Sequence, residues 1–363
     1  VRQNPHWSVR LQDRGLNDPT PEWLERWKLD GVIARVETEG LAKALLRLNL
    51  PVVNLSAIWI DKRFPVIDTN DEQVADLAFD HFSERGFRSL AFCGYPGARW
   101  SDTRQERLAE LARKAGMSYH DFVPRRSRHL TQAPLTLSLE TLGLTQDKEL
   151  IAWLRQLPIP TGVLAANDLR GQQLLGLCRE MEIAVPDHLA ILGVDDDELL
   201  CELTDPPLSS IRPDCERIGL AAANTLESQM NQRRRRPKDL FIPPTGIATR
   251  QSTDALAIDE PLIARAVSYI REHACSGIGV PDVLRKIPLS RSKLERGFNR
   301  HLGRPPKAEI LRLQLQRARE LLLETDLPLP EISTLCGFRH PEYFNALFRQ
   351  KTGIPPGKFR RQK

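Results

Sequence analysis

Short apolar runs alternate with amphipathic stretches through the first 250 residues of the chain. Most runs are flanked by Gly, Pro or Asp, which predicts strands at Trp7–Leu11, Gly31–Ala34, Pro51–Leu55, Ser89–Gly94, Gly162–Ala166 and Ala190–Val194. Apolar positions at helical spacing lie between them and predict helices such as Val74–Arg85, Asp102–Ala115, Asp147–Gln156 and Leu169–Met181. Strand–helix alternation of this kind is typical of a parallel sheet that is covered on both faces.

The alternation runs through two rounds of similar length, with breaks near residues 68–70 and near Leu208. We therefore expect two doubly wound lobes with a cleft between them, and a last strand pairing near Phe241–Thr249. In open sheets of this kind a ligand binds outside the carboxyl ends of the strands. The residues that follow the predicted strands are therefore the candidates for a ligand site.

Strand patterns stop near residue 250, and only helical patterns follow Glu260. They predict helices at Pro261–Ala274, Pro281–Ile287, Ser290–His301, Lys307–Thr325, Pro330–Leu335, His340–Lys351 and Pro356–Arg361. We therefore predict an α/β domain at residues 1–250, a short polar linker at residues 251–259 and an all-α domain at residues 260–363. The four arginines at 233–236 predict a solvated loop, with a direct DNA contact as the alternative.

Two segments of the helical part repeat each other. SRSKLERGFNRHLGRPP, from Ser290, matches HPEYFNALFRQKTGIPP, from His340, at an offset of fifty residues. The matched pairs include Leu294 with Phe344, Phe298 with Phe348 and Gly303 with Gly353, and, at an offset of forty-nine, Val283 with Ile332 and Ile287 with Cys336. Each copy reads as a short helix, a tight turn, a second helix and a Gly-x-Pro-Pro stop, which is the pattern of a helix-turn-helix motif.

The second helix of such a motif can enter the major groove of DNA. The polar residues on the outward faces of the two predicted helices are the candidate DNA contacts: Arg291, Ser292, Lys293, Arg296, Arg300, Arg339, His340, Asn345 and Arg349. The alternative is two ordinary helical hairpins in a bundle. The connecting helix, Lys307–Thr325, would span ~28 Å, so one chain could reach two major-groove segments that lie ~34 Å apart.

The charge distribution agrees with a DNA-binding end. Residues 259–363 hold 20 Lys and Arg against 11 Asp and Glu, a net charge of +9, whereas the rest of the chain has a net charge of −4. No apolar run approaches the ~18 residues of a membrane span, and the six scattered cysteines form no CxxC pair, which favours a reducing, cytoplasmic location. The motifs GxxxxGK[ST], HExxH and GxSxG are missing, so we expect no enzyme activity, no cofactor and no metal.

The helical part resembles regulators of the AraC/XylS type. The resemblance is carried by Ile332-x-x-x-Cys336-Gly337-Phe338, Tyr343-Phe344, Phe348-Arg349, Gly353, Pro356 and Phe359-Arg360, and by Ser290-Arg291-Ser292-x-Leu294-x-Arg296-x-Phe298. It implies sequence-specific binding to an operator, most often by an activator that contacts RNA polymerase. Two departures stand out: Pro328 and Pro330 are expected to shorten a helix of the second motif, and Gly297 should cost its helix ~1 kcal/mol relative to Ala.

The first 250 residues resemble the sensor domain of LacI-type regulators, which has a periplasmic-binding-protein fold. The similar segments are residues 31–34, 67–71, 85–94, 165–168 and 192–196. Domains of this fold begin with a strand and a helix before the segment that starts at His6, so we expect that strand and helix to be missing from the first lobe. The resemblance also implies pairing of the bodies into a homodimer.

Four residues are candidates for binding a sugar in this fold: Arg104, Asn167, Asp195 and Trp100. Asn167 and Asp195 follow predicted strands, Arg104 can bind two adjacent hydroxyls, and Trp100 offers a flat apolar face. The alternatives are a surface position for Arg104 and lobe-packing core for Trp100. Asp168 is expected to cap a helix, as is Asn70 or Asp71, and the acidic run 195–198 is expected to act in capping rather than in metal binding.

A sensor of this type joined to a tail of the AraC type resembles sugar-responsive regulators of pentose catabolism. Arg99-Trp100, Arg104, Gly193-Val194-Asp195 and the junction Arg250–Asp254 carry the resemblance, which implies D-xylose as the effector. Two alternatives stay open. The same architecture could respond to another pentose, a hexose or a purine, or the chain could be a sugar-binding protein with incidental affinity for nucleic acid.

Overall fold

The computed structural model describes residues 7–12, 27–56, 63–95, 97–122, 147–231, 238–255, 257–258 and 260–361. The chain divides into two compact units. The first comprises Val1–Phe82 and Arg88–Ala255, and the second comprises Ser83–Phe87 and Leu256–Lys363. The break after Ala255 lies within the segment 251–259 that separates the strand patterns from the helical patterns.

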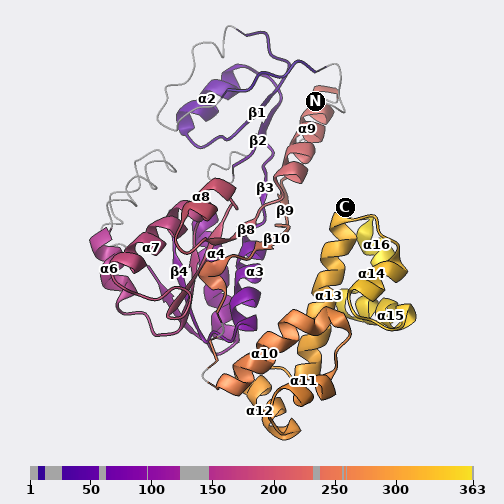
Figure 1. Cartoon of the computed structure of the whole chain (residues 1–363). Coiled ribbons are helices and arrows are strands. Elements are labelled where there is room, and N and C mark those ends of the chain that lie inside the picture. Colours follow the sequence, from indigo (N-terminus) through magenta and orange to yellow (C-terminus); the bar gives the residue numbers. More distant parts are fainter. Residues whose placement is uncertain are drawn as a thin grey trace. The chain divides into compact units, whose positions relative to one another are not determined.

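A six-stranded sheet forms the centre of the first unit (Figure 1). Its strands, in spatial order, are β10 (Gly246–Ala248), β8 (Ser209–Arg212), β7 (Leu189–Val194), β6 (Thr161–Ala165), β4 (Ser89–Cys93) and β5 (Ser118–Asp121). All neighbours pair in parallel except β10, which is antiparallel to β8. The predicted α/β class is confirmed.

Helices cover both faces of this sheet. On one face, α6 (Asp147–Leu154) and α7 (Asp168–Glu180) pack with strand residues such as Val163. The neighbouring position, Gly162, faces the other way because side chains alternate along a strand. A Cβ there would lie 2.5 Å from Phe82 of α3 (Asp71–Glu84), so the glycine allows this helix to pack closely on the second face. The sheet is doubly wound, as predicted.

The rest of the first unit contains two short parallel pairs. β1 (Val32–Ala34) pairs with β2 (Val52–Asn54), and β3 (Ile67–Thr69) pairs with β9 (Leu240–Ile242). The remaining helices are α2 (Glu39–Arg47), α4 (Arg99–Lys114), α8 (Glu198–Leu203) and α9 (Cys215–Asn231).

The predicted strand at Trp7–Leu11 is wrong. Residues 7–12 form no strand, and two of their apolar side chains face solvent, with Val9 57% and Leu11 95% exposed. The alternation of apolar residues here therefore does not mark a buried sheet face.

The second unit is helical, as predicted. Its helices are α10 (Pro261–His273), α11 (Val280–Lys286), α12 (Arg291–Leu302), α13 (Pro306–Glu324), α14 (Leu329–Leu335), α15 (Pro341–Thr352) and α16 (Pro356–Arg360). The repeat offsets reappear in the helix bounds: α12 and α15 are fifty residues apart, and α11 and α14 are forty-nine apart. Both second helices end at a left-handed glycine, Gly303 (φ 68°) and Gly353 (φ 80°).

The structure accounts for the glycine and the two prolines that depart from the family pattern in the helical part. Gly297 is buried, and a Cβ there would lie 2.3 Å from Ile263 Cδ1, so the glycine permits close packing of α12 on α10. Pro328 and Pro330 do not shorten the second motif: Pro328 is the N-cap of α14, and α14 is seven residues long, as α11 is. Proline is compatible with a helix start because the first N–H groups have no partner in the helix.

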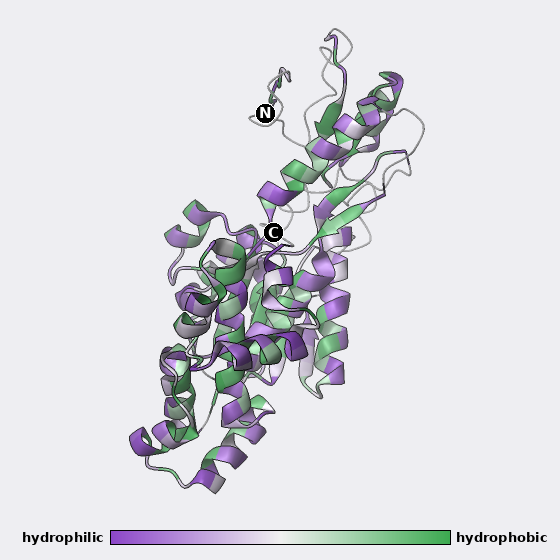
Figure 2. Ribbon diagram, turned by 90° about the vertical axis from the view of Figure 1, so that its right-hand side faces the viewer, coloured by the Kyte–Doolittle hydropathy of each residue, from purple (hydrophilic) through white to green (hydrophobic). Residues whose placement is uncertain are grey.

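Hydrophilic and hydrophobic residues share the helices of both units (Figure 2). Of the helices that the structure describes, none combines the length and the apolar character needed to cross a membrane.

Candidate sugar site and DNA-contacting helices

The carboxyl ends of β4, β6 and β7 lie at one edge of the sheet because the three strands are parallel neighbours. Tyr95 lies two residues beyond β4, Asn167 lies two residues beyond β6 and Asp195 directly follows β7. The positions predicted from the strand pattern therefore reach the edge at which sheets of this kind bind ligands.

Arg104 is buried rather than on the helix surface, so the surface alternative is wrong. Its residue exposure is 6%. Its Nε donates to Asp71 Oδ1 at 2.8 Å and its Nη1 donates to the carbonyl of Ala166 at 2.5 Å. These contacts fix the guanidinium beside the end of β6. Burial raises the pKa of Asp71 even though Arg104 lowers it.

Aromatic side chains adjoin this arginine. The guanidinium carbon of Arg104 lies 5.0 Å from the centre of the Trp100 ring, and the Trp100 ring lies 5.9 Å from that of Tyr95. The Tyr95 hydroxyl donates to Asn167 Oδ1 at 3.4 Å. Three of the four predicted sugar residues thus form one connected group, and Trp100 is only half-buried within it.

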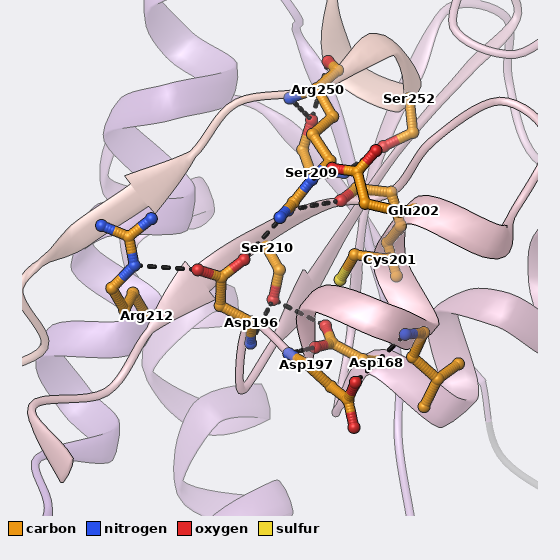
Figure 3. Close-up of polar contacts among 12 residues, drawn as sticks. Asp168, Asp196, Asp197, Cys201, Glu202, Ser209, Ser210, Arg212, Arg250 and Ser252 are labelled. Atoms are coloured by element: carbon orange, nitrogen blue, oxygen red, sulfur yellow. Dashed lines mark hydrogen bonds and ion pairs between the residues drawn. The ribbon is translucent and has the colours of Figure 1, made fainter.

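Asn167, and not Asp168, caps helix α7. Asn167 Oδ1 accepts a hydrogen bond from the backbone N–H of Arg170 at 3.0 Å. Asp168 is already helical, which corrects the expectation that it is the cap. Its carboxylate instead accepts from Ser210 Oγ at 2.6 Å and from the N–H of Asp197 at 2.9 Å (Figure 3). The Asp168 side chain therefore ties α7 to β8 and to the loop after β7.

Burial raises the pKa of Asp168 to about 6, although its hydrogen bonds act in the opposite direction. The residue is 2% exposed. A Cβ at Gly193 would lie 2.2 Å from Asp168 Oδ1, so the glycine makes room for this carboxylate.

The three aspartates that follow β7 have different roles. Asp195 is exposed at the sheet edge, where a ligand could reach it. Asp196 forms ion pairs with Arg212 at 2.8 Å and with Arg250 at 2.9 Å. Asp197 caps α8 by accepting from the N–H of Leu200, as expected for a capping role. In the part of the chain that the structure describes, no group of three or more His, Cys, Asp or Glu side chains could hold a metal ion.

Two residues of this site were missed from the sequence. Tyr95 adjoins the predicted strand Ser89–Gly94, and its place at a strand end was the available signal. Asp71 was considered only as a helix cap, but Asn70 performs that task by accepting from Gln73 N at 3.1 Å. The carboxylate of Asp71 orients Arg104, and nothing in the local sequence pairs two residues thirty-three positions apart.

The predicted DNA contacts lie on the second helix of each motif or within two residues before it. Ser290 caps α12 by accepting from the N–H of Lys293 at 3.3 Å, and His340 is the N-cap position of α15. All nine predicted residues are exposed: Arg291, Ser292, Lys293, Arg296, Arg300, Arg339, His340, Asn345 and Arg349. The apolar faces of the same helices are buried, so these side chains lie on the solvent-exposed faces. Two of them also form ion pairs, Arg291 with Glu295 at 3.0 Å and Arg300 with Glu260 at 3.5 Å. The arginines at 233–236 lie outside the described residues.

Comparisons with known proteins match both units. A model of periplasmic binding protein-like domains matches residues 79–253, and a model of helix-turn-helix domains matches residues 283–362. The xylose operon regulatory protein of Escherichia coli (strain K12) is 31% identical over 98% of this chain and 89% of that protein. The protein of the same name from Haemophilus influenzae is 29% identical over 98% of this chain and 90% of its own. A solved structure of the xylose-binding transcription activator xylR is 30% identical, covers 92% of this chain and 87% of that chain, and has a TM-score of 0.54.

Proposed function

Since the chain belongs to the family of xylose operon regulatory proteins, we propose that it regulates transcription in response to D-xylose bound at the carboxyl ends of β4, β6 and β7. The observation that carries the proposal is the connected group of Arg104, Trp100, Tyr95 and Asn167. Asp195 directly follows β7, the parallel neighbour of the strand that precedes Asn167. A pentose offers adjacent hydroxyls to polar side chains and a C–H surface to an aromatic ring.

Each residue has a role that suits its contacts. Arg104, held by Asp71 and Ala166, donates to two neighbouring hydroxyls of the sugar. Asp195 accepts hydrogen bonds from the sugar, and Asn167 bonds to it from the end of β6. Trp100 covers the apolar face of the ring.

The helical unit binds operator DNA through α12 and α15. Its exposed basic residues are suited to phosphates and to the edges of guanines, for which arginine is the commonest partner. We expect the protein to act in the cytoplasm as a homodimeric activator that contacts RNA polymerase, as the resemblance to the AraC/XylS type implies.

Calorimetric titration of the chain with D-xylose tests the proposal, with L-arabinose, D-ribose and D-glucose as comparators. Selective binding of D-xylose in the micromolar range is the expected result. Selective binding of a comparator would keep the regulator and replace its effector. The absence of binding by every sugar would contradict the site.

A second measurement addresses the alternative of incidental nucleic-acid affinity, which the family match over the whole chain does not favour. A regulator should prefer its operator over random duplex by ~10³-fold or more. The operator can be obtained by selecting duplexes from a random library with the wild-type chain in the presence of D-xylose. Selection that yields no preferred sequence would contradict the regulatory role.

A further inference from the structure

The loop that follows β7 has a strained backbone. Asp195 has a φ of +112° and Asp196 a φ of +52°, and residues other than glycine rarely adopt a positive φ. Hydrogen bonds to the neighbouring strand hold the loop in place: Asp195 N–H donates to the carbonyl of Ile211 at 3.0 Å, and Asp196 N–H donates to Ser210 Oγ at 3.0 Å. Strain of this kind persists where surrounding contacts fix it, and it is common at ligand sites and switches.

Two arginines share the carboxylate of Asp196 (Figure 3). Arg212 Nε lies 2.8 Å from Oδ2, and Arg250 Nη1 lies 2.9 Å from Oδ1. The side chains of Asp196 and Arg250 are 11% and 14% exposed, whereas that of Arg212 is 53% exposed. Solvent therefore screens the ion pair of Asp196 with Arg250 less than its ion pair with Arg212. Loss of the Arg250 pair should disturb the loop more.

Arg250 is itself held by several further contacts. Its Nε donates to Glu202 Oε1 on α8 at 2.6 Å, and its Nη1 also donates to the carbonyl of Leu208 at 3.0 Å. Its backbone N–H donates to Ser209 Oγ at 2.8 Å. The guanidinium thus joins the loop after β7 to α8 and to the start of β8.

The residues that follow Arg250 lead directly to the helical unit. Ser252 Oγ donates to the carbonyl of Ile191 on β7 at 2.6 Å, and Thr253 Oγ1 donates to Ser209 Oγ at 2.7 Å. The first unit ends two residues later, at Ala255. The segment 250–255, through which the chain leaves the first unit, is therefore attached to β7 and β8. Within this exit segment, Arg250 binds the carboxylate of Asp196, the neighbour of Asp195.

We propose that Arg250 is a positioning residue that couples sugar binding at Asp195 to the DNA affinity of the helical unit. The inference rests on the proposed function. A sugar that bonds to Asp195 changes the strained backbone at Asp196, the Asp196 carboxylate carries the change to Arg250, and the exit segment 250–255 moves with it. The exit segment then has two arrangements, and the sugar favours the one whose protein conformation binds it more tightly.

The test compares Arg250→Met with Arg212→Met in the full chain. Arg212 is the matched control because it binds the same carboxylate but lies outside the exit segment. For each variant, calorimetry gives the affinity for D-xylose, and fluorescence anisotropy gives the affinity for the selected operator duplex with and without saturating D-xylose. The ratio of the two operator affinities is the coupling, a quantity that a purely structural role would leave unchanged.

We expect the wild-type chain to show a coupling of ~5-fold or more. Arg250→Met should reduce it to within about twofold of unity while D-xylose still binds, and Arg212→Met should keep the wild-type ratio. Wild-type coupling in Arg250→Met, or an equal loss in Arg212→Met, would overturn the inference and leave the proposed function intact. A wild-type chain that binds no sugar would instead remove the proposed function.

A second variant covers the case in which Arg250→Met fails to fold. Glu202 is on the surface, with its side chain 58% exposed, and it anchors Arg250 without touching Asp196. Glu202→Ala removes the oxygen that accepts from Arg250 Nε. This variant should fold, bind D-xylose like the wild type and lower the coupling in part. Full wild-type coupling in Glu202→Ala would contradict the role of Arg250, because its position would then not matter.

Discussion

Asp195 is the residue at which the sugar site is most directly tested. It is exposed, so its replacement should not unfold the sheet. Asn suits the replacement because it tolerates a positive φ better than Ala does. Asp195→Asn removes the charge that accepts hydroxyl hydrogen bonds, and we expect the affinity for D-xylose to fall by roughly 10- to 100-fold.

Calorimetry measures this loss, and Asp187→Asn, at another exposed aspartate outside the site, serves as the control. Circular dichroism should give the same spectrum for both variants. An Asp195→Asn variant with wild-type affinity would exclude Asp195 from the site.

Asp168 makes the stability of the first unit depend on pH. Burial raises its folded pKa to about 6 from the ordinary value of 3.8, so the folded state binds more protons than the unfolded state between these values. The contribution of this group to stability therefore increases as the pH falls from about 7 to about 4, by up to roughly 3 kcal/mol. Asp168→Asn should remove this contribution.

Urea unfolding at pH 7 and pH 5 measures the effect through tryptophan fluorescence. All six tryptophans lie before residue 154, so the signal reports on the first unit. The difference in unfolding free energy between wild type and variant should change with pH in favour of the wild type at pH 5. A constant difference would mean that Asp168 has an ordinary pKa.

At the scale of elements, Gly297 sets the packing of α12 on α10. A Cβ at this position would lie 2.3 Å from Ile263 Cδ1, in a buried contact with little room to adjust. Gly297→Ala should therefore destabilise the helical unit by about 1–3 kcal/mol, although alanine alone would favour the helix by ~1 kcal/mol.

Thermal unfolding followed by circular dichroism measures this change. Gly357→Ala in α16 is the control, because a Cβ there would lie an ordinary 3.7 Å from Leu329. It should leave stability unchanged or raise it slightly. A stabilised Gly297→Ala variant would show that the two helices can separate at little cost.

The elements that the sequence predicts well are those whose patterns are local. The buried parallel strands β4, β6 and β7 are short apolar runs, and the repeat gave the bounds of both motifs to within one or two residues. β8 was missed because Ser209 and Ser210 are polar, although both are buried and bonded to other side chains. β5, Ser118–Asp121, was missed because an edge strand with polar residues lacks an apolar run.

The candidate site was predictable where it depends on strand ends and not where it depends on pairing in space. Asn167 and Asp195 follow from the position of β6 and β7, and Arg104 and Trp100 from the resemblance. The tie between Arg104 and Asp71, and the ion pairs of Asp196 with Arg212 and Arg250, join residues that are far apart in the chain. Such pairs form only after the sheet order is fixed.

At the scale of the whole molecule, the two activities reside in units of opposite net charge. Replacing an exposed arginine of a recognition helix should therefore weaken DNA binding without changing the sugar site. Arg296→Ala and Arg349→Ala should each lower operator affinity by about 1–3 kcal/mol and leave the affinity for D-xylose unchanged.

Operator titrations at several salt concentrations measure both the affinity and its salt dependence, which should become less steep where a phosphate contact is lost. Arg265→Ala, at an exposed arginine of α10, provides a control that removes the same charge away from α12 and α15. Unchanged affinity in both Arg296→Ala and Arg349→Ala would contradict the assignment of the recognition helices.

The two helix-turn-helix motifs are fixed to one another within the helical unit. The buried Gln314 of α13 donates to the carbonyls of Ala274, at 2.9 Å, and of Gly337, at 3.4 Å, and so joins the helix before the first motif to the turn of the second. A Cβ at Gly337 would lie 2.6 Å from the N atom of Gly277, which shows how closely the backbones approach there. Motifs held in this way cannot adjust their separation to the DNA.

The operator should therefore contain two half-sites about one helical turn apart, ~10–11 base pairs between centres. Inserting five base pairs between them turns one half-site to the opposite face of the duplex, and we expect the affinity to fall to that of a duplex with a single half-site. Anisotropy titrations with the selected, the extended and the single-site duplexes measure this. If the extended duplex bound as tightly as the selected one, the motifs would have to separate in solution, and the contacts of Gln314 would have to break when DNA binds.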